Sequence, residues 1–197
     1  GIASQFCIGV FCHPSGSRDR YFRGKMEDFR IYRGTWNQTD VDTFYNLDPP
    51  APIAGDPIAE WLFEDPPNPT LQDNTANKRD LVKINNASTA SGKVGNAMIL
   101  NSGAQQFAET DHIPLNAQSF SLTFWMKREP GFDGDGVLFS QCEYDTSEKC
   151  LHARFYQGWG ELKFGFWSND LDTPSGDFLL SSEVWNHLGL VYNHSMR

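Results

Sequence analysis

Four cysteines, arranged in two close pairs, are the residues of this chain with the clearest chemistry. Cys7 and Cys12 flank a short apolar turn, and Cys142 and Cys150 flank a polar stretch. These separations favour local disulfides, because the pattern lacks the two CxxC clusters of a structural zinc site. We therefore predict two disulfides, each of which pins one turn of the chain.

Three asparagines stand in the acceptor pattern for N-linked glycosylation, with Ser or Thr two positions later. They are Asn37, Asn86 and Asn193. One such pattern often arises by chance, but three beside paired cysteines are typical of a secreted protein, since disulfides persist in oxidising compartments. We expect a glycoprotein that is extracellular, either secreted or at the cell surface.

Three carboxylates, Glu143, Asp145 and Glu148, lie between the second pair of cysteines. Two carboxyl groups about 5 Å apart are the machinery of a retaining glycosidase. The stretch around them has almost no apolar alternation and is typical of a solvated hairpin loop, which offers no desolvation to raise the pKa of an acid. We therefore predict no catalytic residues. The histidines are scattered without metal-ligand spacing and predict ordinary hydrogen-bonded side chains.

Aromatic residues near two predicted strands are candidates for carbohydrate binding. Tyr156 and Trp159 lie at the end of one strand, and Trp167 ends another. Sugar rings have apolar CH faces that pack on aromatic rings, while amides and carboxylates bind the hydroxyls. The alternative is that Trp159 caps the end of the fold and Trp167 covers neighbouring strands, because scattered surface aromatics are common.

Alternation of apolar and polar residues dominates the chain and predicts strands. In residues 119–127 one face is apolar, which predicts a half-buried strand with Trp125 on its outer face. At most two helical turns are expected, in residues 38–45, capped by Thr39 or Asp40. Many short strands between turn residues indicate an all-β sandwich or barrel. The other predicted strands are 59–63, 136–141 paired with 151–156, 162–167 and 185–192.

The formal charge of −9 at pH 7 argues against nucleic acid as a partner, because an acidic chain repels the phosphate backbone. No apolar run approaches the length of a membrane span, so no membrane-spanning segment is expected. No signal peptide precedes Gly1, which suggests a processed chain or a piece of a larger one.

Four segments resemble strands of the laminin-G-like, concanavalin A-like jelly-roll family, in the order of the family. The resemblance implies the fold class, an antiparallel β-sandwich of the concanavalin A-like jelly-roll type. Residues 57–64 resemble the opening strand, 92–100 the GKxGNALxF strand, 119–127 the SFTxSxWxK strand and 185–192 the WHHVAxVYD strand.

Another segment matches the family at an unexpected place. Residues 21–32 resemble its closing strand, of the form FxGxIDDVRIY, and residues 6–9 resemble the penultimate strand. The resemblance thus divides the chain into three parts. These are closing strands of a laminin-G-like domain in 1–46, a proline-rich linker in 47–57, and a laminin-G-like sandwich in 58–197 that lacks its own closing strands.

Three arrangements would cover the strand edges that such an open sandwich exposes. The chain is a window on tandem repeats of a larger protein, which we favour. Alternatively, residues 1–46 close the sheets of residues 58–197 in a permuted arrangement, or a neighbouring molecule donates strands. The expected protein partners are other extracellular modules or neighbouring copies, and glycans are the other expected partner.

A structural calcium ion is the one cofactor that the resemblance implies. Family members hold it through a loop resembling DSSGNGNDG and an acidic pair before the closing VRIY. This chain lacks both glycines of that loop, and Lys78 and Arg79 add positive charge, so an ordinary solvated turn is the alternative. The candidate ligands, whose oxygens suit a hard cation, are Asp28, Asp73, Asn74 and Asn77.

The spacing of Glu143, Asp145 and Glu148 also fits the ExDxxE motif of family-sixteen glycoside hydrolases, which place it on a strand inside a cleft. Here the motif lies in a predicted loop. The expected function is therefore a non-catalytic, extracellular laminin-G-like module of a larger repeat glycoprotein, serving adhesion, matrix or surface-filament structure. A carbohydrate-binding lectin-like module is the alternative, and a glycoside hydrolase is a further one.

Overall fold

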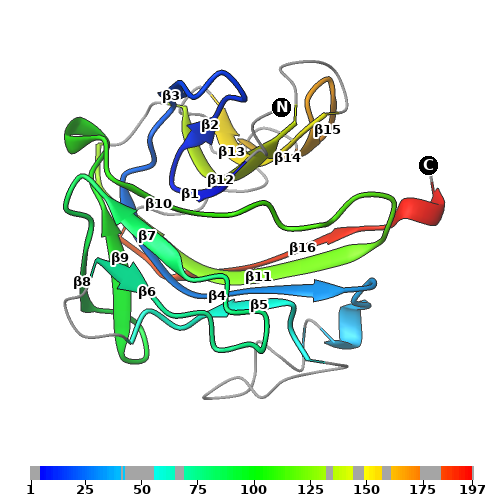
Figure 1. Cartoon of the computed structure of the whole chain (residues 1–197), viewed down its shortest axis with the longest axis horizontal. Helices are drawn as coiled ribbons and strands as arrows, with labels where there is room; N and C mark the ends of the chain where they lie inside the picture. Colours follow the sequence, from blue (N-terminus) through cyan, green and yellow to red (C-terminus); the bar gives the residue numbers. More distant parts are fainter. Residues whose placement is uncertain are drawn as a thin grey trace.

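The computed structural model describes residues 5–40, 42, 56–64, 69–131, 135–143, 149–156, 161–173 and 183–196. They form two large antiparallel sheets that share one hydrophobic core (Figure 1), which confirms the predicted all-β sandwich. The jelly-roll type of the sandwich stays a prediction. Among the described residues no helix is long and apolar enough to cross a membrane.

The larger sheet has eight strands in the spatial order β15-β14-β13-β12-β1-β10-β7-β6. The predicted hairpin of 136–141 and 151–156 is present as the antiparallel pair β12 and β13. The bounds are β1 Phe6–Ile8, β6 Thr70–Leu71, β7 Leu81–Ile84, β10 Phe107–Thr110, β12 Gly136–Cys142, β13 Cys150–Tyr156, β14 Glu161–Phe166 and β15 Asn169–Asp172.

The second sheet has six strands, in the order β16-β11-β4-β9-β8 with β5 paired to β4. The described residues also form a small ribbon of β2 and β3, two short 3-10 helices and the helical segment around residues 38–42 that is described below. The bounds are β4 Gly24–Arg33, β5 Ala59–Trp61, β8 Ser88–Ser91, β9 Asn96–Leu100, β11 Phe120–Arg128, β16 Asn186–Tyr192, β2 Phe11–Cys12, β3 Arg18–Asp19, η1 Ser102–Ala104 and η2 His194–Met196.

Strands from residues 1–46 occupy internal positions in both sheets, as the blue strands in Figure 1 show. β1 lies between β12 and β10, and β4 lies between β11 and β9. The structure therefore has the closure within one chain that the sequence leaves open as one of three arrangements. Most of the predicted linker, residues 47–55, lies outside the described residues.

A cluster of aromatic side chains joins the two sheets through the core. Phe29 of β4 stacks on Phe124 of β11 with ring centroids 4.9 Å apart, and contacts Phe139 of the other sheet edge-on at 5.6 Å. Phe6 and Trp61 complete the cluster, and all five side chains are fully buried. Each buried ring of this kind stabilises the fold by roughly 1.5–3 kcal/mol, so strands far apart in sequence depend on one another.

The outer face of β11 is buried, which differs from the half-buried strand that the sequence predicts. Ser121 and Trp125 on this face are both buried. Ser121 Oγ donates to the carbonyl of Gly34 and accepts from the backbone N–H of Trp36, both at 2.9 Å. The Lys93 ammonium lies 4.1 Å from the ring centroid of Trp125. Two loops therefore cover a face that alternation alone assigns to solvent.

Two glutamates hold the turn that begins at Gly92. Glu27 accepts from the backbone N–H groups of Lys93 and Val94, at 2.5 and 2.8 Å. Glu64 accepts from the backbone and side-chain nitrogens of Asn96, at 2.9 and 3.1 Å. A Cβ at Gly92 would lie 2.2 Å from a Glu27 carboxylate oxygen. Glycine here thus leaves room for the carboxylate that satisfies the turn.

A short helical segment includes residues 38–40 and 42, within the predicted range. Asn37 and Asp40 cap it reciprocally. Asp40 Oδ2 accepts from the backbone N–H of Asn37 at 2.8 Å, and Asn37 Oδ1 accepts from that of Asp40 at 3.0 Å. The cap is therefore Asn37, and not Thr39 or Asp40 as predicted, because its side chain reaches the N–H three residues later.

Candidate functional site

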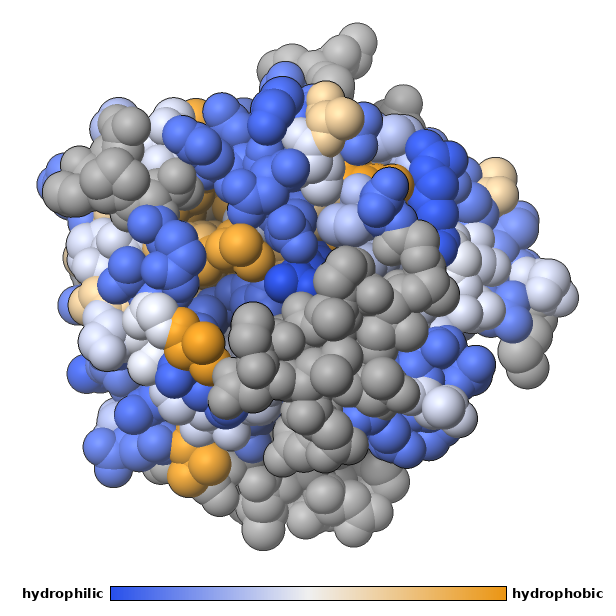
Figure 2. All heavy atoms as spheres, turned by 90° about the horizontal axis from the view of Figure 1, so that it is seen from below, coloured by the Kyte–Doolittle hydropathy of each residue, from blue (hydrophilic) through white to orange (hydrophobic). Residues whose placement is uncertain are grey.

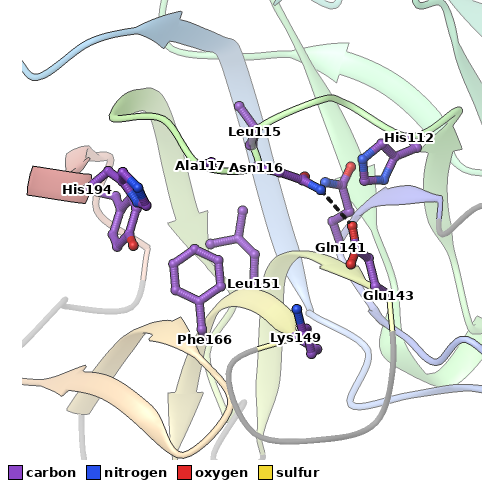
Figure 3. Close-up of a pocket in the computed structure, with 11 residues that line it drawn as sticks. His112, Leu115, Asn116, Ala117, Gln141, Glu143, Lys149, Leu151, Phe166 and His194 are labelled. Carbon is purple, nitrogen blue, oxygen red and sulfur yellow. Dashed lines mark hydrogen bonds between the residues drawn. The ribbon is translucent and has the colours of Figure 1, made fainter. Parts of the chain in front are cut away.

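A cleft of about 170 Å³ opens at the end of the sandwich nearest the Cys142–Cys150 disulfide (Figure 3). Five separate parts of the chain line it: the β10–β11 connection, the end of β12, the start of β13, the end of β14, and the end of β16 with η2. The cleft is thus a product of the tertiary fold, because no single segment contains its residues.

The inner surface of the cleft is apolar. Leu115 and Leu151 are buried, and Phe166 is half-buried beside Tyr192. The rings of Phe166 and Tyr192 meet edge to face with centroids 4.9 Å apart. Their partly exposed surfaces offer a ligand an apolar contact of defined shape.

A buried glutamine fixes the loop that forms one wall. Gln141 Oε1 accepts from the backbone N–H of Ile113 at 2.7 Å, and Gln141 Nε2 donates to the Ile113 carbonyl at 2.9 Å. The oxygen and the nitrogen of the Gln141 amide therefore both bond to the backbone of Ile113, in the β10–β11 connection. This clamp places Leu115 and Asn116 over the cleft without a helix or strand to hold them.

The rim of the cleft is polar and carries both signs of charge. Asn116 Nδ2 donates to Glu143 Oε1 at 2.9 Å, the dashed line in Figure 3. Lys149, the residue before β13, also lines the cleft, and the backbone N–H of Glu143 donates to the Lys149 carbonyl at 2.9 Å. His112 and His194 complete the rim. Amide, carboxylate, ammonium and imidazole groups thus surround an apolar floor, which is typical of a small-ligand site.

Both predicted disulfides are present. Cys142 and Cys150 stand directly opposite each other on β12 and β13, beneath the rim residues Glu143 and Lys149. Cys7 and Cys12 close the turn between β1 and β2. All four cysteines are buried. The second disulfide therefore fixes the spacing of the strands that carry the rim.

A second hollow continues along the seam between β14, β15 and β16, and shares Phe166 and Tyr192 with the cleft. Leu171 on this seam is 68% exposed. Asn193 lines the hollow, so a glycan on this predicted site would lie next to it.

Figure 2 shows another face, where apolar groups are small and separated by hydrophilic side chains.

The asparagines of the three predicted glycosylation sites are accessible. Asn37 and Asn86 are exposed, and Asn193 is half-buried. Asn193 Oδ1 accepts from the backbone N–H of Ser195 at 3.0 Å and from its hydroxyl at 2.7 Å. An oligosaccharide would therefore meet no core packing at these positions. Glycosylation itself stays a prediction.

The predicted calcium ligand Asp73 is fully buried, and hydrogen bonds already satisfy its carboxylate. One oxygen accepts from the backbone N–H groups of Glu60 and Thr75, at 3.0 and 2.9 Å. The other accepts from the Thr75 hydroxyl at 2.9 Å and from the backbone N–H of Arg79 at 2.8 Å. Calcium binding by Asp73 would require these bonds to break.

Cationic side chains lie on the oxygens around Asp73. Arg79 Nη1 donates to the Ile58 carbonyl at 3.0 Å, and so does Asn77 Nδ2. Lys78 Nζ donates to the Asp73 carbonyl at 3.3 Å. Asn74, another of the four candidate ligands, is exposed. Lys78 and Arg79 therefore already donate to backbone carbonyl oxygens, which are the kind of ligand that a calcium ion would need.

Asp28 lies in a β-bulge with φ of 52°, where the β4–β11 register shifts. Its carboxylate is 2.7 Å from Arg30 Nε, and Arg30 Nε also lies 3.0 Å from Glu60. Burial raises the pKa of Asp28 to about 6, and the attraction of Arg30 opposes that rise. Asp28 is therefore held by an ion pair on the outer face of the second sheet.

Tyr156 and Trp167, the two predicted carbohydrate-binding residues that the structure describes, do not lie together. Tyr156 ends β13 opposite Glu161, whereas the backbone N–H of Trp167 donates to Cys150 at the start of β13. Strand geometry separates these positions by roughly 20 Å. The Tyr156 ring also faces two cations, Arg154 and Lys163. Trp159 lies outside the described residues.

Glu143 of the glycosidase-like motif lies on the rim of the cleft, hydrogen-bonded to Asn116. Asp145 and Glu148 lie outside the described residues. Among the described residues, one group of His, Cys, Asp and Glu is close enough to share a metal ion, and it consists of Glu109 with Cys7 and Cys12. Its sulfurs form the disulfide, so they are not free thiolate ligands.

Two further histidines lie outside the cleft, of which His152 is buried and His187 is half-buried. His187 packs on Trp125 with ring centroids 4.9 Å apart, on the outer face of the second sheet and not in the core. Burial and the nearby charges of Lys93 and Arg30 lower its pKa to about 4. His152 Nε2 lies 3.5 Å from Asp170 Oδ2, and this pairing lowers the pKa of Asp170 against the opposing effect of burial.

Sequence reasoning missed most of the cleft. Phe166 and Tyr192 read as strand residues, and Gln141 reads as the end of a hairpin arm. The cysteine pair is the one local signal near the site, because it marks the strand ends that carry Glu143 and Lys149. Comparison with known proteins found no matching family model, curated protein or solved structure.

Proposed function

We propose that this chain is a non-catalytic, extracellular laminin-G-like module of a larger repeat glycoprotein, which serves adhesion, matrix or surface-filament structure. The observation that supports the proposal is the combination of two buried disulfides with accessible asparagines in all three glycosylation patterns. Disulfides of this kind form and persist in oxidising compartments, where glycans are attached.

Expression of the chain through a secretory pathway tests this proposal. We expect mass mapping without reduction to find both local disulfides, and enzymatic removal of N-glycans to lower the mass at Asn37, Asn86 and Asn193. Substitution of each asparagine by glutamine, one at a time, is the matched control for each site. Free thiols at all four cysteines in the secreted protein, or no glycan at any site, would contradict an extracellular role.

The second candidate is a carbohydrate-binding module, and the cleft is the observation that favours it. Phe166 and Tyr192 offer edges and faces for the apolar side of a sugar ring. Asn116, Glu143 and Lys149 offer donors and acceptors for hydroxyls at the rim. The cleft therefore combines aromatic surface and polar groups in one place, whereas the aromatic rings of Tyr156 and Trp167 lie at opposite ends of β13.

Binding to a glycan array, measured for the wild type and two variants, tests the carbohydrate proposal. Asn116→Ala removes an exposed rim amide, and we expect it to weaken binding at least tenfold, a loss of about 1.4 kcal/mol. Trp159→Ala tests the aromatic platform predicted from the sequence and should leave binding unchanged if the cleft is the site. Loss of binding with Trp159→Ala alone would move the site away from the cleft. Cleavage of a polysaccharide that Glu143→Gln abolishes would instead support a glycosidase.

A further inference from the structure

Leu171 lies on the inward face of the larger sheet but is largely open to solvent. In the register of β14 and β15, Phe164 stands opposite Leu171 and Phe166 stands opposite Asn169, so these four side chains share one face. Phe164 is buried in the core, which makes this the inward face. Leu171 is nevertheless 68% exposed. Within the described residues, the second sheet, which ends at β16, therefore leaves Leu171 uncovered.

The inward face of β16 also becomes more open toward the end of the strand. Leu188 is buried, whereas Leu190 and Tyr192 on the same face are only partly buried. The hollow along the seam has a volume of about 330 Å³, and Phe166, Leu171 and Tyr192 all line it. An occupant of this hollow must therefore be small and must present an apolar face.

Asn193 follows β16 directly and also lines the hollow. Its Oδ1 accepts from the backbone N–H and the hydroxyl of Ser195, so these bonds leave Nδ2 as the atom to which a glycan attaches. The backbone N–H of His194 donates to Ser119 Oγ at 3.0 Å and so fixes the chain next to the attachment point. A sugar bonded to Nδ2 is thus held beside the hollow at high effective concentration.

The chemistry of an N-linked sugar matches the groups that line the hollow. The first sugar is N-acetylglucosamine, whose CH groups pack on aromatic rings and whose acetamido and hydroxyl groups form hydrogen bonds. Phe166 and Tyr192 supply rings that meet edge to face, with centroids 4.9 Å apart. Asn169 is exposed on the same face of the sheet as Leu171 and offers its amide. Apolar and amide groups therefore lie within reach of the attachment point.

We propose that the first sugar of an N-linked glycan on Asn193 packs into this hollow, against Leu171, Phe166 and Tyr192, and stabilises this edge of the sandwich. The inference rests on the proposed function as an extracellular glycoprotein. Attachment forms a bond between Asn193 Nδ2 and C1 of the sugar. The bond from C1 to the diphosphate of a lipid-linked oligosaccharide donor breaks, and Nδ2 releases one proton. The chain then binds part of its own modification, and the sugar shields Leu171 from water.

A cycle of variants of the full chain, unfolded in urea, tests the proposal. The chain with Asn37→Gln and Asn86→Gln is made in a secretory pathway, and its glycan is trimmed enzymatically to one N-acetylglucosamine on Asn193. The reference adds Asn193→Gln and carries no sugar. We expect the sugar to lower the equilibrium constant of unfolding roughly 2- to 10-fold, the effect of a contact as strong as an aromatic pair. Leu171→Ser, introduced into both proteins, should remove most of this gain.

A sugar on Asn86 is the matched control, because Asn86 is exposed in the turn between β7 and β8. The chain with Asn37→Gln and Asn193→Gln, trimmed in the same way, should show an effect of its sugar that Leu171→Ser does not change. NMR gives a second measurement that does not depend on the folding of any Leu171 variant. The sugar on Asn193 should show nuclear Overhauser contacts to the ring of Phe166 or Tyr192.

The outcomes separate this inference from the proposed function. A sugar on Asn193 that shows no contact to either ring, and a gain that Leu171→Ser leaves unchanged, would mean that the glycan extends into solvent. That result would overturn the inference and leave the proposed function intact. Mass mapping of the wild type that finds sugar on Asn37 and Asn86 but never on Asn193 would do the same. Absence of sugar at all three asparagines would overturn both.

Discussion

His187 is a half-buried imidazole whose surroundings favour its neutral form. Its pKa falls from 6.5 to about 4 because burial disfavours the charged ring and because Lys93 and Arg30 add positive charge nearby. The unfolded chain therefore binds a proton at this histidine below pH 6.5, whereas the folded chain binds it below about pH 4. The stability that neutral His187 confers is present above pH 6.5 and is lost as the pH falls toward 4.

The variant His187→Gln isolates this effect. We expect the stability of the wild type, relative to the variant, to fall by on the order of 1–3 kcal/mol as the pH drops through that window, since each unit of pKa corresponds to about 1.4 kcal/mol. Asp28 acts in the opposite direction, because its raised pKa of about 6 favours the folded state as the pH falls. Both proteins contain Asp28, so its contribution cancels in the difference. Urea unfolding across the window measures the difference, and a constant value would mean that His187 titrates normally in the folded state.

The strand pair β12 and β13 depends on the disulfide that joins the two strands at one end. Cys142 and Cys150 lie eight residues apart in sequence. Closing a loop of this size stabilises a protein by roughly 2–3 kcal/mol through the entropy of the unfolded chain. We expect the double substitution of Cys142 and Cys150 by serine to lower the free energy of unfolding by about that amount, as measured in urea.

The double substitution of Cys7 and Cys12 by serine is the control. It should lower the free energy of unfolding by a similar amount, but should leave any ligand binding at the cleft intact. Equal loss of binding in both variants would indicate general destabilisation.

The aromatic core ties residues 1–46 to the remaining strands, so the molecule should unfold as one unit. Phe29 comes from the N-terminal segment, and its ring contacts Trp61, Phe124 and Phe139. Phe29→Ala should lower the free energy of unfolding by roughly 3–5 kcal/mol. Hydrogen exchange followed by mass spectrometry should show the same loss of protection in peptides from β4 and from β12. Loss confined to β4 would indicate that residues 1–46 form a separate unit, as tandem repeats would require. Phe166→Ala, at a half-buried position away from this cluster, should cost less.

Local chemistry made part of this structure predictable. The strand at 119–127 follows from the period of its side chains, and the disulfides follow from short cysteine separations. Both depend on residues that are close in sequence, so no knowledge of the fold is needed. The cap at Asn37 was not predicted, although its signal is also local. The Oδ1 atom of Asn37 accepts from the backbone N–H of Asp40, three residues later, and not from that of an adjacent residue.

The remaining features depend on segments that meet only after folding. The outer face of β11 is buried because the chain at 34–36 folds over Ser121, and the Asp73 carboxylate is satisfied by N–H groups from as far away as Glu60. The cleft needs Gln141 to hold the loop at Ile113 and needs Tyr192 to reach Phe166. The pattern of the sequence shows where apolar and charged residues stand along the chain. Which of them become buried, and which distant residues bond to one another, depends on the three-dimensional packing. The closure of both sheets by residues 6–33 is decided in the same way, by which strand edges lie side by side.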